Sequence, residues 1–268
     1  MIKIENLEVC GWEPAIRGMR NPMNSWEKSD SLFYTPDGDY RDINGNTGPC
    51  NVDIDMEIGY NDHKLMMRLA KAGTEHSKYR RMIVVYADIT APLYWWKEFD
   101  TYKVGTVANS CSTMHKIHAK EFTMDDFSCE HLLNWPEIDP NITNIEFSMS
   151  EEAFLADPTS IWDTPTISIN DYSNDRLYFS PYGILNQVVD MLNRCRELYL
   201  ETKDKRYWWQ MIQLLPSSYN QKRTVMLNYE NLAAMYRQRK DHKLDEWHEF
   251  CHTIEELPYS ELITLKEN

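Results

Sequence analysis

The pattern of apolar and polar residues divides the chain into strands and amphipathic helices. Residues 2–9 alternate with a period of two, which predicts a half-buried strand. Residues 82–89 are rich in Ile, Val and Tyr and predict a second strand, and residues 144–148 a third. Apolar residues spaced three and four apart, together with cap and stop signals, predict helices over 62–73, 93–99, 123–133, 182–200, 207–215, 228–240 and 245–253.

Three side-chain oxygens stand where helices are expected to begin. Asp62 and Thr123 can each accept a bond from an N–H group that has no partner within the helix. Thr90 offers the same oxygen ahead of Pro92, and proline suits a first helical turn because its missing N–H loses no bond there. The second strand therefore leads directly into a helix.

Turn signals and polar residues gather in two segments. The polar, turn-rich segment 11–42 is expected to be a long loop with short helices, and exposed loops are expected near 21–55, where Asn-Pro, Pro-Asp-Gly and Asn-Gly turns occur. The acidic, proline-containing segment 157–175 is expected to be an exposed insertion. With no internal repeat or interdomain linker, the pattern predicts a single α+β domain over residues 1–268, with a mixed or antiparallel sheet and long helices.

The charge balance limits the partners. A formal charge of -14 and a pI near 5.0 make nucleic acid an unlikely partner, because affinity for nucleic acid comes mainly from Lys and Arg neutralising phosphates. No stretch approaches the roughly 18 apolar residues of a membrane span, and the first residues lack the apolar run of a signal peptide. We therefore expect a cytoplasmic protein without a membrane partner.

The cysteines and histidines show no metal-binding spacing. The 6 cysteines are scattered without a CxxC pair, which is typical of free thiols in a reducing compartment. His242 and His248 lie among charged residues without ligand spacing. We assign no metal site.

The most specific pattern lies in two separated segments. The first joins residues 91–96 (APLYWW) to 109–112 (NSCS), and the second joins 215–216 (LP) to 228–232 (NYENL) and 237–239 (RQR). Their order and spacing resemble the flavin-dependent thymidylate synthases, whose signature is RHRxxSxNExSxRY. The stretch AIRGMR at residues 15–20 is similar to an early AxRAAR-like stretch of that family. The resemblance spans most of the chain.

This resemblance implies the family's fold and a homotetramer with active sites at subunit interfaces. The family binds FAD, dUMP, NADPH and methylenetetrahydrofolate, and its reduced flavin relays a methylene carbon to the uracil ring. By resemblance, Asn228 and Lys103 would bind the cofactor, and Asn109 and Ser112 would lie in the nucleotide-binding loop. Arg239 would face the pyrimidine as a substrate-binding and catalytic residue, since a guanidinium can stabilise negative charge developing on the ring.

Most of the family's cationic positions differ in this chain. The RHR triplet falls on residues 101–103 or 102–104, and Lys103 is the single Lys or Arg in either alignment. Glu230 replaces a family Arg, which reverses the charge beside Asn228. The nearby cations Arg17, Arg20 and Lys28 form a group that could replace the missing phosphate contacts.

Two functions of different classes remain open. One is a nucleotide- or flavin-binding protein with its ligand in an intersubunit cleft, acting as a pyrimidine nucleotide one-carbon transferase or a related nucleotide-modifying enzyme. The other is a catalytically inactive homologue that binds a protein partner or sequesters a ligand. The site residues also have structural interpretations: Arg239 as a solvated helix end, Lys103 as a surface lysine, and Asn109 and Ser112 as turn or cap residues.

Overall fold

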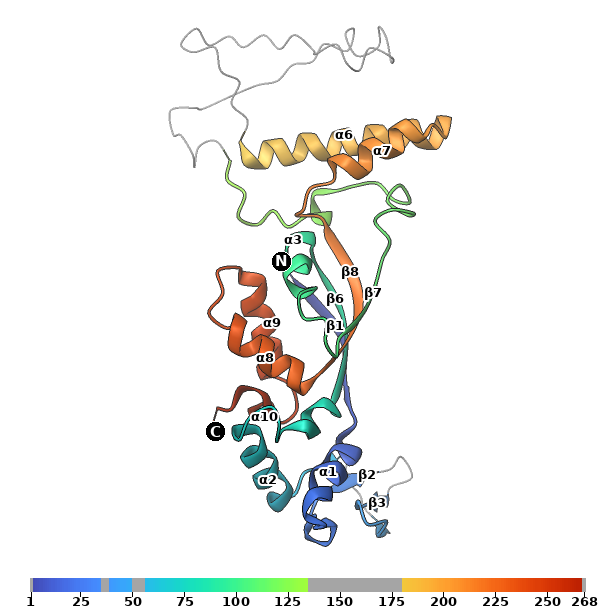
Figure 1. The fold of residues 1–268 in the computed structure, drawn as a ribbon. Coiled ribbons are helices and arrows are strands. Elements are labelled where there is room, and N and C mark those ends of the chain that lie inside the picture. The colour runs from blue at the N-terminus through green and yellow to red at the C-terminus, as the bar shows by residue number, and fades with distance from the viewer. Residues whose placement is uncertain (1, 35–38, 50–55, 135–179, 267–268) are drawn as a thin grey trace, which may run out of the picture. The chain divides into compact units, whose positions relative to one another are not determined.

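The structure is a computed structural model and describes residues 2–34, 39–49, 56–134 and 180–266 (Figure 1). The chain forms two compact units, unit 1 with residues 1–116 and 216–268, and unit 2 with residues 117–215. Helices accompany antiparallel sheets, which confirms the α+β class. The single domain expected for the whole chain stays a prediction.

Unit 1 is built on a four-stranded antiparallel sheet with the order β1-β6-β8-β7 (Figure 1). Its strands are β1 (Lys3–Cys10), β6 (Val84–Pro92), β7 (Val107–Ser110) and β8 (Asn220–Asn228). The central strands β6 and β8 pair along their whole length, from Val84 opposite Asn228 to Pro92 opposite Asn220. The sequence predicted β1 and β6, whereas β7 and β8 are new.

One face of this sheet carries the core of unit 1. Val85 and Ile89 of β6, and Leu227 of β8, are buried in the same hydrophobic cluster as Leu232 of α8 (Tyr229–Arg239) and Phe250 of α9 (Asp245–Glu255). The alternation of the strands thus turns every second side chain toward these two helices. Unit 1 also contains α1 (Trp12–Arg20), α2 (Tyr60–Lys71), α3 (Leu93–Phe99), α10 (Glu261–Thr264) and the 3-10 helices Asn21–Met23, Trp26–Lys28 and Lys78–Arg81.

Part of the segment expected to be loop forms a second antiparallel sheet. Its order is β4-β3-β2-β5, with β2 (Leu32–Tyr34), β3 (Asp39–Arg41), β4 (Thr47–Pro49) and β5 (Met56–Glu57). The short helices expected here are present as the 3-10 helices Asn21–Met23 and Trp26–Lys28, whereas the helix α1 and these very short strands were not expected. The Asn44-Gly45 turn lies between β3 and β4.

Two of the expected helix caps are replaced by other residues. Asp30, from a distant loop, accepts bonds from the backbone N–H groups of Asn61 and Asp62 in the first turn of α2. The Asp62 carboxylate instead binds Arg20. Thr90 lies inside β6, and Pro92 occupies the position before α3. The direct passage from strand to helix at this point is confirmed.

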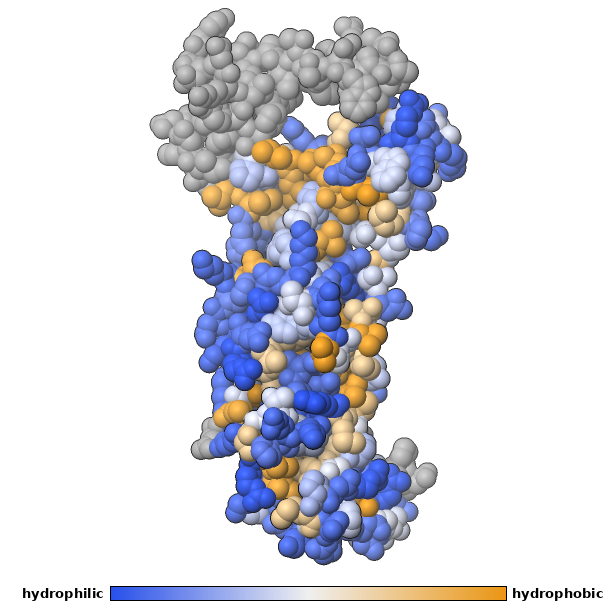
Figure 2. Space-filling view, viewed as in Figure 1, coloured by the Kyte–Doolittle hydropathy of each residue, from blue (hydrophilic) through white to orange (hydrophobic). Residues whose placement is uncertain are grey.

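Unit 2 contains α6 (Pro181–Thr202) and α7 (Lys205–Leu214), both predicted. Leu192 and Met211 are completely buried in its core. Thr123 caps as expected, but it begins only a 3-10 turn, Met124–Asp126, since Phe127 already has extended backbone angles. Figure 2 shows apolar residues gathered over the α6 and α7 region, where Ile184, Met191, Leu200, Trp209 and Leu214 are exposed.

Two sequence expectations lie outside the described residues, namely the strand at 144–148 and the exposed insertion at 157–175. Within the part of the chain that the structure describes, none of the helices combines the length and apolarity needed to cross a membrane.

Candidate functional site

The loop of residues 101–106, between α3 and β7, is held against α8 along its length. Asn231 donates from Nδ2 to the Val104 carbonyl at 2.7 Å, and Asn228 Nδ2 lies 3.5 Å from the Gly105 carbonyl. Two turns further along α8, the Tyr102 hydroxyl donates to Gln238 Oε1 at 2.9 Å. Polar side chains of one helix therefore fix the position of this loop.

Gly105 allows the loop to approach α8 closely. Its φ of 78° lies in the left-handed region, which glycine adopts without steric cost. A Cβ at this position would lie 3.0 Å from both Asn228 Nδ2 and Asn231 Oδ1. A side chain added here would be strained by the left-handed backbone and would require the Asn228 and Asn231 side chains to shift by a few tenths of an ångström.

Arg239, at the end of α8, is bound on three sides. Its Nε donates to the Tyr102 hydroxyl at 2.8 Å, and its Nη1 donates to Glu98 Oε2 at 2.7 Å. The guanidinium carbon lies 4.7 Å from the ring centroid of Trp247, which is completely buried. The guanidinium is thus stacked, ion-paired and 17% exposed.

Two further groups lie close to Glu98 Oε2, the oxygen that binds Arg239. Trp247 Nε1 donates to Glu98 Oε2 at 2.9 Å, and His242 Nε2 lies 3.3 Å from it. His242 Nδ1 accepts from the Leu244 N–H, so a neutral ring carries its proton on the nitrogen that faces Glu98. Arg239, Trp247 and His242 therefore converge on one carboxylate oxygen.

Three of the five predicted site residues lie in or beside this loop, with Asn228 and Arg239 at opposite ends of α8, about 16 Å apart at the usual helical rise. Asn228 caps α8 by accepting from the Asn231 N–H at 2.9 Å, so it has the structural role of a cap as well as its place beside Gly105. Lys103 lies in the loop, is exposed and forms no ion pair with any described residue. Arg239 has the contacts given above.

The other two predicted residues lie further along the sheet. Asn109 is exposed in β7 opposite Thr224, four residues along β8 from Asn228, or about 13 Å at the usual rise of a strand. Ser112 lies beyond β7, where its Oγ accepts from the N–H groups of Met114 at 3.3 Å and His115 at 2.9 Å. This is the geometry of a turn residue.

One of the three cations suggested as replacements for phosphate contacts, Arg20, serves the fold instead. Arg20 is buried, and it donates to Asp62 at 2.6 Å and to the carbonyls of Ser25 and Lys28. The hypothesis is wrong for Arg20, because releasing its guanidinium would leave the buried Asp62 carboxylate unpaired.

Glu230, the apparent charge reversal beside Asn228, is also paired internally. Its Oε2 lies 2.5 Å from Arg80 Nη2 and accepts from the Ser77 hydroxyl at 3.1 Å. The side chain of Arg80 is 6% exposed, so this is a largely buried pair. Glu230 therefore does not present an uncompensated negative charge.

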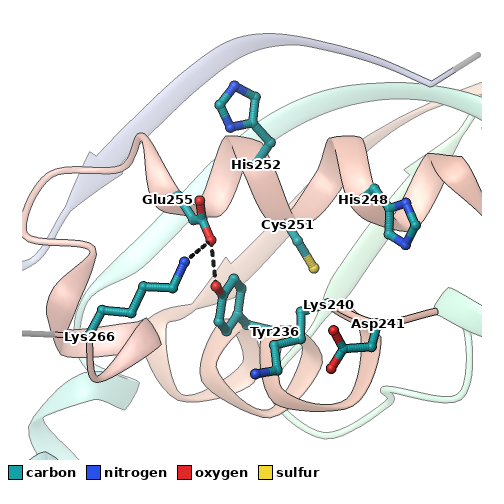
Figure 3. Close-up of a pocket in the computed structure, with 8 residues that line it drawn as sticks. All are labelled: Tyr236, Lys240, Asp241, His248, Cys251, His252, Glu255 and Lys266. Carbon is teal, nitrogen blue, oxygen red and sulfur yellow. Dashed lines mark hydrogen bonds and ion pairs between the residues drawn. The ribbon is translucent and has the colours of Figure 1, made fainter.

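A separate open pocket of about 310 Å³ lies beside α8 and α9 (Figure 3). Lys266 lies 2.5 Å from Glu255, and its hydrogen bond lowers the pKa of that carboxyl. Burial raises the pKa of the Cys251 thiol to about 11, so the thiol stays protonated at neutral pH. The pocket is lined by Tyr236, Lys240, Asp241, His248, Cys251, His252, Glu255 and Lys266.

His248 and His252 are four residues apart on α9, a spacing found in some zinc sites. Their rings do not converge in Figure 3. Among the described residues, no three His, Cys, Asp or Glu side chains are arranged to hold a metal ion. The pocket offers no preformed metal centre.

Sequence reasoning missed Glu98, Tyr102, Asn231 and Trp247 as members of the site. Glu98 and Arg239 are separated by 141 residues, so no local spacing links them. Asn231 had a usable signal, because it follows Asn228 by three residues at an expected helix start, where a side chain returns toward the cap.

The fold defined by these elements is an α+β fold with an antiparallel sheet, and it is found in known structures. Thymidylate synthase X from Helicobacter pylori, solved with FAD and dUMP, is similar with a TM-score of 0.56 and 13% identity over 98% of each chain. A second structure of that enzyme with FAD and dUMP gives a TM-score of 0.54 at 13% identity, over 98% of this chain and 97% of the other.

The UMP/dUMP methylase PolB from Streptomyces cacaoi, bound with 5-Br UMP, has a TM-score of 0.50 at 10% identity. The match covers 96% of this chain and 88% of PolB. No protein-family model and no curated protein sequence matches this chain. The particular fold is therefore that of the flavin-dependent thymidylate synthases, and identities this low show the fold alone.

Proposed function

We propose that this is a flavin-dependent thymidylate synthase-like protein that binds a pyrimidine nucleotide at the surface formed by the 101–106 loop and α8. The observation that carries the proposal is that Lys103 lies in the loop while Asn228 and Arg239 contact it from the two ends of α8. The fold supports it, because proteins of the same fold were solved with dUMP or 5-Br UMP. One-carbon transfer to the pyrimidine ring is the corresponding reaction.

The charged groups of the loop suit one phosphate better than two. Lys103 can approach a nucleotide phosphate without leaving another described carboxylate. Arg239 Nη2 donates to no described residue, which leaves its two N–H groups available to a pyrimidine carbonyl. These groups fit a nucleoside monophosphate, whereas the diphosphate of FAD would find a single unpaired lysine in the loop. FAD and NADPH are weaker candidates, and we derive no flavin step.

The alternative function is a catalytically inactive homologue that binds a protein partner or sequesters a ligand. Two ion pairs favour it specifically. Arg239 is bound to Glu98 and Glu230 to Arg80, so charges near the loop are neutralised within the chain. A protein with this arrangement could retain the fold and the proposed homotetramer after losing the chemistry.

Equilibrium titration of the purified protein with dUMP and with FAD tests the proposal. We expect Lys103→Ala to weaken dUMP binding by about tenfold or more, the equivalent of one charge-assisted hydrogen bond. Lys97→Ala is the matched control, because Lys97 is an exposed lysine at the end of α3 and its loss changes the net charge equally.

The two functions predict different results. A protein that binds dUMP equally well with and without Lys103 would contradict the proposed site. A colourless protein that gains neither FAD nor dUMP would favour the inactive homologue. Light scattering of the eluted protein measures the assembly, and a mass other than four chains would contradict the homotetramer.

A further inference from the structure

Glu98 occupies the place where Arg239 would receive an anionic group. Arg239 Nη1, Trp247 Nε1 and His242 Nε2 all face Glu98 Oε2, at 2.7, 2.9 and 3.3 Å. Three donors from separate points of the chain thus form a preformed site for one negatively charged oxygen. The oxygen that fills it belongs to the protein itself.

The pair can open because its carboxylate is only partly desolvated. The Glu98 side chain is 34% exposed, and no described residue donates to its second oxygen, Oε1. A carboxylate at such a position recovers hydration when it turns outward, so the pair is much easier to break than a buried one.

Arg239 would stay in place after Glu98 turned away. Its Nε is held by the Tyr102 hydroxyl at 2.8 Å, and its guanidinium is stacked on the Trp247 ring at 4.7 Å. Neither contact involves Glu98. The three donors would therefore remain directed at the same point, ready for an anionic oxygen of a ligand.

We propose that Glu98 controls the affinity of this site as a built-in anion that an incoming anionic oxygen must displace from Arg239. While Glu98 remains bound to Arg239, the ligand approaches an ion pair with no net charge. Separating Glu98 from Arg239 costs free energy, which weakens ligand binding. With the carboxylate turned outward, the same three groups donate to an anionic oxygen of the ligand. The identity of the physiological ligand rests on the proposed function. The competition between Glu98 and an added anion for Arg239 can be tested separately.

The test compares Glu98→Gln with Asp100→Asn in the full-length protein. Gln keeps the size of the side chain and removes its charge. Asp100 is two residues away and pairs with Arg223 at 2.8 Å, so its variant has the same net charge but leaves Arg239 bound. The ligands are dUMP and, separately, inorganic phosphate, each titrated calorimetrically at low ionic strength.

We expect Glu98→Gln to bind dUMP about tenfold more tightly than the wild type and to gain binding of inorganic phosphate, with Asp100→Asn unchanged. Unchanged dUMP binding in Glu98→Gln would overturn the inference and leave the proposed function intact. Equal gains in both variants would also overturn it, because the effect would then come from net charge.

A gain of phosphate binding without any dUMP binding would overturn the proposed nucleotide ligand and support the role of Glu98. If Glu98→Gln lacks the wild-type circular dichroism spectrum, Glu98→Asp replaces it, because the shorter side chain keeps the charge while withdrawing it from Arg239. Glu98→Asp should then bind phosphate more tightly than the wild type, and equal affinity would overturn the inference.

Discussion

Two arginine–carboxylate pairs of unit 1 have similar bond lengths but different surroundings. Arg20 and Asp62 are 2.6 Å apart, with side chains 4% and 0% exposed, whereas Arg239 and Glu98 are 2.7 Å apart, with side chains 17% and 34% exposed. Asp62 uses both oxygens, and Oδ2 alone accepts from the Ser29 and Ser31 hydroxyls and from two backbone N–H groups. Glu98 uses only one oxygen.

The difference separates an ion pair that supports the fold from one that can respond to a ligand. Asp62 cannot be hydrated without opening the packing between α1, α2 and the loop at residues 29–31. Glu98 needs only a change of side-chain rotamer. Solvation, rather than bond length, therefore indicates which arginine is available for binding.

The largest expected effect comes from breaking the buried pair. Asp62→Asn should lower the free energy of unfolding by about 3–5 kcal/mol, because it leaves the Arg20 charge buried without a counter-charge. Glu98→Gln should lower it by less, because the Glu98 carboxylate is partly hydrated. Urea unfolding monitored by circular dichroism measures both, and similar losses would contradict the distinction between the pairs.

A smaller effect is expected where the 101–106 loop meets α8. Gly105→Ala should lower the free energy of unfolding by about 1–2 kcal/mol from the left-handed backbone alone, and further through its contacts with Asn228 and Asn231. Gly45→Ala is the matched control, because Gly45 has a φ of 86° and open space where a Cβ would lie. Equal losses of stability in Gly105→Ala and Gly45→Ala, measured by thermal or urea unfolding, would show that the 101–106 loop does not pack closely against α8.

The smallest effect concerns the ion pair between Lys222 of β8 and Asp88 of β6. Hydrogen bonds from Thr224, Asn6 and Lys222 lower the pKa of Asp88 from 3.8 to about 2. Since the folded-state pKa is depressed, the stabilisation is present above pH 4 and is lost as the pH falls from about 4 to 2. Removing the largest contribution with Thr224→Val should move the Asp88 pKa upward.

Titration of the Asp88 carboxyl by NMR measures this shift directly. Wild-type protein should titrate near pH 2, and Asp88→Asn should lose less stability than wild type between pH 5 and pH 2.5. A wild-type carboxyl that titrates near pH 4 would contradict the contacts described for Asp88.

The sequence revealed elements with strong local patterns and missed those that depend on distant partners. The helix α6 buries a regular apolar stripe that periodicity located, the Ile, Val and Tyr content located β6, and Pro216 marked the end of α7. All residues of β7 are exposed, and β8 begins with Asn-Gln-Lys-Arg, so neither strand shows a plain alternation. Gln221, although polar, is buried and donates to the Cys111 carbonyl.

The candidate site was predicted in part and for a comparable reason. Resemblance drew attention to Lys103, Asn228 and Arg239, which the structure places on one loop and helix. It also suggested Asn109 and Ser112, which lie elsewhere along the sheet. The role of Glu98 could not be inferred, because its contact with Arg239 depends on how α3 and α8 pack.

The order of strands in the first sheet affects how the chain can fold during its synthesis. Strand β7 has β8 as its partner, and the residues bonded beside this pair, Cys111 and Gln221, are 110 residues apart. A ribosome adding about 5–20 residues per second needs roughly 5–20 s to make that stretch. During this interval β1 and β6 can pair, but the other edge of β6 has no partner strand until β8 is synthesised. A nascent chain paused between these strands would expose that edge to other chains.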